Sequence, residues 1–61
     1  MSKTLTNAIA KGKREMMKFL GTCSIMDIVY GLEYEYDLSP EETEILKIKL
    51  ENYDNEKLGL Y

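Results

Sequence analysis

The stretch LEYEYDLSPEE, residues 32–42, decides between two folds for this chain. Its first seven residues alternate apolar and acidic side chains, which is the pattern of a half-buried strand. The four residues that follow, Ser39 to Glu42, are a helix-start signal. Tyr34 and Tyr36 would share one face of a strand, but they would point in different directions from a helix. The choice therefore sets both the fold and the aromatic rings that face water.

The helix-start signal predicts a helix over about 40–53. The Ser39 side chain can accept hydrogen bonds from the free amides of a first turn, and Pro40 at the first helical position loses none. Glu42 completes a capping box with Ser39. The apolar residues that cluster on one side of this helix are Leu46, Leu50 and Tyr53. Both the capping and the periodicity favour helix over strand here.

A second helix is predicted over about 25–36, ahead of the same stretch. Ser24 and Asp27 resemble a capping box with the shorter aspartate in place of glutamate. The residues that would share the inner face are Ile25, Ile28, Val29, Leu32 and Tyr36. On this interpretation Tyr30 and Tyr34 stack one turn apart on the outer face.

The alternative fold is α+β, with an amino-terminal helix packed on a β-hairpin of strands 32–38 and 46–52. Its cross-strand pairs match well, since Asp37 would face Lys47 and Tyr36 would face Ile48. Its loop would need the seven residues 39–45, which is longer than most hairpin loops, and the helix-start signal would go unused. We therefore favour an all-α fold, either a small three-helix bundle or a helical hairpin plus a third helix.

The first third of the chain predicts an amphipathic helix over about 4–20. Its apolar stripe consists of Leu5, Ala8, Ile9, Gly12, Met16, Phe19 and Leu20. Lys3, Lys11, Arg14 and Lys18 lie on the opposite side. Gly12 sits near the centre of the stripe, where its missing side chain would let another element approach closely.

Sixty-one residues are enough for a single small domain, 1–61, and we expect a loose tail over residues 55–61. A chain of this size buries a modest fraction of its surface, so disulfides, metals or partners usually add stability. The single cysteine, Cys23, excludes an internal disulfide, and the absence of histidine disfavours zinc. Association with another molecule, including a homo-oligomer, is the remaining source of stability.

Charge is divided unevenly along the chain. Residues 1–21 carry a net charge of +4 and residues 22–61 a net charge of −7, which gives −3 for the whole chain. The amino end lacks the apolar run of a signal peptide, and the longest apolar runs are too short to span a bilayer. One unpaired thiol fits a reducing compartment, so we expect a cytoplasmic protein.

No set of residues forms a catalytic signature, so we predict no enzymatic activity, no cofactor and no metal site. The sequence has no histidine for proton transfer near neutral pH or for activation of Cys23. The run Asp54-Asn55-Glu56 suggests calcium superficially, but it lacks the ligand spacing and the glycine of a calcium loop. The paired acids, such as Glu33 with Asp37, fit solvated helix surfaces better than a catalytic cleft.

The predicted function is a small regulatory or inhibitory protein that binds a larger protein. Tyrosines are enriched at protein interfaces, and five tyrosines are many for a core of this size. The candidate protein-binding residues are Tyr30, Tyr34, Asp27, Glu33 and Asp37.

Two alternative functions remain open. Lys3, Lys11, Arg14 and Lys18 on the first helix could follow a phosphate backbone, although the acidic later helices would be repelled by nucleic acid. The chain could also be a structural subunit of a larger assembly, held by the apolar stripe of the first helix.

Overall fold

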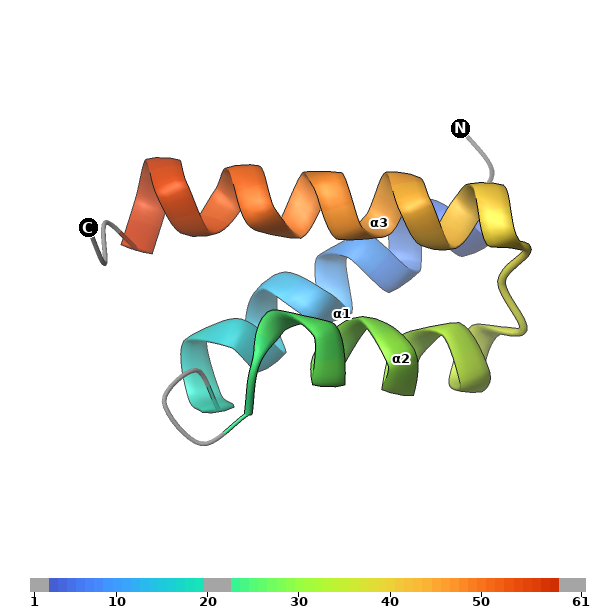
Figure 1. The fold of residues 1–61 in the computed structure, drawn as a ribbon, viewed down its shortest axis with the longest axis horizontal. Helices are drawn as coiled ribbons and strands as arrows, with labels where there is room; N and C mark the ends of the chain where they lie inside the picture. Colours follow the sequence, from blue (N-terminus) through green and yellow to red (C-terminus); the bar gives the residue numbers. More distant parts are fainter. Residues whose placement is uncertain (1–2, 20–22, 59–61) are drawn as a thin grey trace.

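The computed structural model describes residues 3–19 and 23–58, with the backbone alone for 57 and 58, and is a small three-helix bundle (Figure 1). Helix α1 spans Lys3–Phe19, α2 spans Ile25–Tyr36 and α3 spans Pro40–Tyr53. A short π-helical turn, η1, spans Asp54–Leu58. Each of the three α-helices packs against the other two. The predicted all-α fold is therefore confirmed.

Helices α2 and α3 form an antiparallel pair joined by a short connection, and α1 crosses behind them (Figure 1). Both segments of the alternative hairpin are helical, since 32–36 belongs to α2 and 46–52 lies within α3. The α+β alternative is therefore wrong, and residues 3–19 and 23–58 include no strand. The alternation of residues 32–38 does not produce a strand, because two complete capping boxes stabilise the helices on either side of it. Each box supplies hydrogen-bond acceptors to amides of the first helical turn that have no partner within the helix.

Both predicted helix starts are capped by the expected serines. The Ser24 Oγ accepts from the Asp27 amide at 3.2 Å, and the Asp27 carboxylate accepts from the Ser24 amide at 3.3 Å. Ser39 and Glu42 make the same reciprocal pair at 3.2 Å and 3.1 Å. These local hydrogen bonds fix where α2 and α3 begin.

The turn between α2 and α3 depends on Asp37, which adopts the left-handed conformation with φ of 52°. Its amide donates back to the Tyr34 carbonyl, and the amide of Leu38 donates to the Glu33 carbonyl at 3.0 Å. This is the hydrogen bonding of a Schellman-type helix end, with aspartate in the position that glycine usually occupies. Leu38 is then buried and ties the turn to the core.

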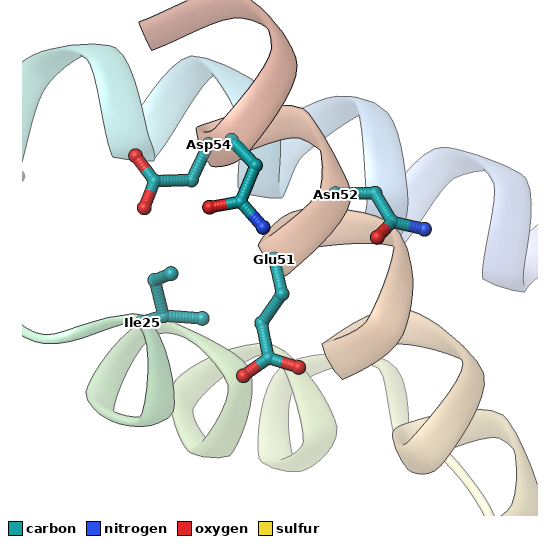
Figure 2. Close-up of a pocket in the computed structure, with 5 residues that line it drawn as sticks. Ile25, Glu51, Asn52 and Asp54 are labelled. Atoms are coloured by element: carbon teal, nitrogen blue, oxygen red, sulfur yellow. The ribbon is translucent and has the colours of Figure 1, made fainter. Parts of the chain in front are cut away.

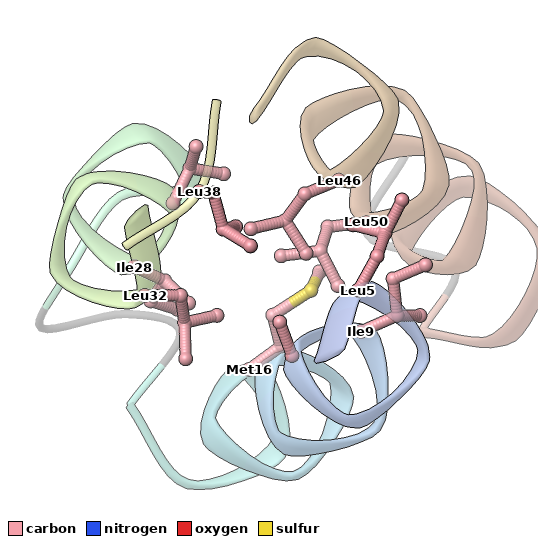
Figure 3. Packing of buried hydrophobic residues seen from close by; sticks show 10 residues of the cluster. Leu5, Ile9, Met16, Ile28, Leu32, Leu38, Leu46 and Leu50 are labelled. Carbon is pink, nitrogen blue, oxygen red and sulfur yellow. The ribbon is translucent and has the colours of Figure 1, made fainter. Parts of the chain in front are cut away.

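The three helices enclose one apolar core (Figure 3). Its buried residues are Leu5, Ala8, Ile9, Met16, Ile28, Val29, Leu32, Leu38, Leu46 and Leu50. Gly12 lies against this core, and a Cβ atom there would be 2.9 Å from Leu50 Cδ1 and 3.0 Å from Leu32 Cδ1. The predicted close approach at Gly12 is confirmed.

Two local expectations need correction. Phe19, assigned to the apolar stripe, is 45% exposed, because it ends α1 beyond Met16, the last buried residue of that helix. The chain does not become a loose tail at residue 55, since η1 continues to Leu58. The Asp54 amide donates to the Glu51 and Leu50 carbonyls of α3, and residues 54–58 contain no glycine or proline. Leu20 and residues 59–61 lie outside the described residues.

Candidate functional site

The outer face of α2 presents the two tyrosines that the sequence singled out. Tyr34 is 90% exposed and Tyr30 is 58% exposed. They stand four residues apart on the helix, so their rings are neighbours on one face. Leu32, between them in sequence, is buried, and Tyr36 is half-buried against the core. The predicted division of α2 into an inner and an outer face is therefore what the structure shows.

The three acids predicted beside these tyrosines have different surroundings. Asp27 is exposed, and its carboxylate is engaged in the cap of α2. Glu33 is half-buried and turns toward α3, where its carboxylate accepts a hydrogen bond from Thr43 Oγ1 at 3.0 Å. Asp37 is exposed at the end of the helix. The structure thus leaves Asp27 and Asp37 at the two ends of the tyrosine face, whereas Glu33 also joins α2 to α3.

The predicted basic face of α1 is altered by one cross-helix ion pair. Lys11 Nζ lies 2.6 Å and 2.8 Å from the carboxylate oxygens of Glu35 on α2. The hydrogen bond that Lys11 donates to Glu35 is the main cause that raises the pKa of Lys11 above its ordinary value of 10.5. Lys3, Arg14 and Lys18 are exposed. Because Lys11 is neutralised by an acid at this distance, the charge that the face offers to phosphates is weaker than the sequence suggests.

Lys13 of α1 also contacts a neighbouring helix, since its Nζ lies 5.3 Å from the ring centroid of Tyr53 on α3. A cation over a tyrosine ring is attracted by the ring quadrupole. With Lys11 bound to α2 and Lys13 resting on α3, two of the five cations in the basic segment join helices together. These contacts favour a structural role for this part of the charge over a nucleic-acid interface.

A cleft of about 330 Å³ lies between the start of α2 and the end of α3 (Figure 2). It is lined by Ile25, Glu51, Asn52, Asp54 and Asn55. Asp54 is only 3% exposed, and its Oδ1 has no hydrogen-bond partner among the described residues. Leaving a buried polar atom unpaired costs on the order of 1–3 kcal/mol. The sequence drew attention to Asp54 and Asn55 through a superficial likeness to calcium ligands, but it gave no sign that Asp54 is buried.

A second cleft, of about 300 Å³, lies on the side of α3 that faces α1. Its lining is Lys13, Lys49, Asn52, Tyr53 and Glu56. Two lysines and one glutamate give it mixed charge. The cleft therefore does not concentrate one sign of charge. The ammonium group of Lys13 also lies over the Tyr53 ring.

Within residues 3–19 and 23–58, no three histidine, cysteine, aspartate or glutamate side chains are grouped so that they could hold a metal ion. In the same part of the chain no helix combines the length and the apolar character needed to cross a membrane. Cys23 is a free, exposed thiol.

Comparisons of the chain with protein-family models, with curated proteins and with solved structures gave no match.

Proposed function

We propose that this chain is a small non-enzymatic regulatory or inhibitory protein that binds a larger protein through the outer face of α2. Tyr30 and Tyr34 supply the contact area, Asp27 and Asp37 supply acidic groups at its two ends, and Glu33 lies at its edge, where Thr43 holds it. The partner surface is expected to hold apolar pockets for the two rings with basic residues at their rim. The proposed location is the cytoplasm, where a single exposed thiol such as Cys23 stays reduced.

The observation that carries this proposal is the exposure of Tyr34 and Tyr30, 90% and 58%, on one helix face. The core of the bundle is complete without either ring. Tyrosine brings a large amphipathic surface with few rotatable bonds, and such residues often dominate binding energy when they enter a pocket. Two neighbouring rings that lie outside the buried core are therefore a strong candidate for an anchor.

Charge supports the choice of a basic partner surface. The chain carries −3 overall, and −7 over residues 22–61, which include all of α2 and α3. Complementary charge mainly speeds encounter and selects among partners. Among the basic residues of α1, Lys11 is paired with Glu35 on its own molecule.

The test compares two double variants in capture of partners from an extract of the native host. Tyr30→Ala with Tyr34→Ala should reduce recovery of the bound protein at least about tenfold, as expected for anchor residues worth about 2 kcal/mol or more. Ile45→Ala with Ile48→Ala is the matched control, since it removes two exposed large side chains from α3 instead. The far-UV circular dichroism of both variants should equal that of the parent. Undiminished capture by the tyrosine variant would contradict the proposal.

The alternative of a structural subunit held by the apolar stripe of α1 loses its main support. Five residues of that stripe, Leu5, Ala8, Ile9, Gly12 and Met16, are buried inside the bundle. A stripe already covered by α2 and α3 cannot also form an intermolecular contact without unfolding. Assembly through another surface is a separate question, which sedimentation at increasing protein concentration would answer.

A further inference from the structure

The cleft between α2 and α3 combines one apolar wall with two carboxylates. Figure 2 shows the Glu51 side chain extending from α3 toward α2 and the Asp54 carboxylate, at the start of η1, on the same side of the chain as Ile25, while the Asn52 amide is turned away from them. Asn55, on η1, completes the lining. The cleft is therefore an acidic site with an aliphatic floor, separate from the tyrosine face.

Asp54 is the unusual member of this site. Its side chain is almost completely buried, yet its Oδ1 accepts no hydrogen bond from any described residue. Buried carboxylates in folded proteins are nearly always paired or hydrogen-bonded. This oxygen is covered in the unbound protein, so a guest in the cleft would gain its acceptor by displacing part of the wall over Asp54. Asp54 also begins the π-helical turn, and such turns occur frequently at functional sites.

We propose that this cleft binds the side chain of an arginine from a partner polypeptide. The aliphatic part of arginine matches Ile25, because long cationic side chains lay their methylene groups on apolar surface. The guanidinium group carries five N–H donors, so one edge can donate to Asp54 Oδ1, and its positive charge is attracted by the exposed Glu51 carboxylate of the same cleft. A cleft of about 330 Å³ has room for such a side chain.

A metal ion fits the same residues less well. Only two of the lining residues are carboxylates, and the described residues include no group of three acids, histidines or cysteines suited to a metal. Calcium takes six to eight oxygen ligands at short range. An aliphatic wall contributes none of these ligands, but it does complement the stem of an arginine.

This inference extends the proposed function by assigning a basic anchor to the partner, but it can be tested separately. Along α2, Tyr30 lies five residues beyond Ile25, which is about 7.5 Å of helix rise. At about 100° per residue the two side chains point about 140° apart around the helix, so a partner has to extend around α2 to contact both features. The cleft binds arginine whether or not the tyrosine face captures a protein.

The experiment is an NMR titration of the isotope-labelled full chain with N-acetyl-arginine amide. Saturable shifts are expected for the Ile25 methyl groups and the Asn55 side-chain amide. N-acetyl-citrulline amide, which has nearly the same shape without the charge, should produce none. Asp54→Asn should weaken arginine binding by about tenfold, as expected for loss of a charge-assisted hydrogen bond. Glu51→Gln should weaken it several-fold, and Glu41→Gln, at the opposite end of α3, should leave it unchanged.

Each outcome decides the proposal. If Asp54→Asn fails to fold, the exposed pair Glu51→Gln and Glu41→Gln still separates the cleft from general charge effects. Equal binding of arginine and citrulline, unshifted Ile25 signals, or shifts with calcium chloride in place of arginine would overturn it. Tyr30→Ala with Tyr34→Ala should bind arginine normally. If arginine binding is absent while that variant still loses its partner, the cleft inference falls and the proposed function stands.

Discussion

Replacing Gly12 by alanine tests how closely the three helices approach, and Gly31 provides a matched control. Both glycines lie in helix interiors, Gly12 in α1 and Gly31 in α2. A Cβ atom at Gly12 would lie 2.9 Å from Leu50 Cδ1 and 3.0 Å from Leu32 Cδ1. At Gly31 a Cβ atom would have no neighbour within 4 Å. The same substitution therefore meets a packed core in one helix and open space in the other.

The expected free energies follow from two opposing terms. Alanine is favoured over glycine in a helix interior by about 1 kcal/mol, so Gly31→Ala should raise the free energy of unfolding by about that amount. At Gly12 the same gain is offset by overpacking, which costs about 1–3 kcal/mol. The methyl groups of Leu50 and Leu32 have little freedom to move, because both side chains are fully buried. Gly12→Ala should therefore be neutral or destabilising by up to about 2 kcal/mol.

Urea denaturation followed by far-UV circular dichroism measures both variants against the parent chain. The free energies of unfolding of Gly12→Ala and Gly31→Ala should differ by about 1–3 kcal/mol. Thermal melts provide a second measurement, since about 1 kcal/mol moves Tm by about 4–8 °C in a domain of this size. If Gly12→Ala proves as stabilising as Gly31→Ala, the helices do not meet closely at Gly12. The packing of α1 against Leu50 and Leu32 would then be refuted.

Three further predictions concern the helix ends and the ion pair. Ser39→Ala removes the reciprocal cap of α3 and should lower the free energy of unfolding by about 1 kcal/mol in urea titrations. The pKa of Lys11 is raised by Glu35, so this pair stabilises the fold below pH 10.5 and its contribution is lost as the pH rises through the raised pKa. Lys11→Met should therefore show a smaller alkaline loss of stability than the parent. Asp37 has a positive φ, which glycine adopts without strain, so Asp37→Gly should raise the free energy of unfolding by up to about 1 kcal/mol. A free energy of unfolding below that of the parent would show that the aspartate side chain stabilises the turn.

The parts of the fold that the sequence predicted well depend on short-range chemistry. The caps at Ser24 and Ser39 involve residues three positions apart, so their partners can be read directly from the chain. Helical periodicity then places Leu32 inside and Tyr34 outside once α2 is known to be a helix. Gly12 was recognisable because a glycine at the centre of an apolar stripe costs helix stability unless close packing compensates.

The parts that the sequence missed depend on how the helices are arranged in space. Lys11 and Glu35 are 24 positions apart, and nothing in either local pattern selects that pairing. Glu33 was assigned to the acidic outer face, but the rotation of α2 against α3 brings it to Thr43. Asp54 is an ordinary acid in the sequence, but it is 3% exposed at the point where α3 passes into η1.

The geometry of α2 separates the residues that fold this protein from those proposed to bind its partner. The free energy of folding comes from the inner face, where Ile28, Val29 and Leu32 are buried. Tyr34 is 90% exposed, so its ring contributes almost no buried area to folding. Apolar surface left in water is unfavourable, and that free energy is recovered when a partner covers it. Tyr30 is 58% exposed and buries part of its surface in the bundle, so a loss of binding in Tyr30→Ala with Tyr34→Ala is attributed to the interface when urea denaturation gives the variant the same free energy of unfolding as the parent.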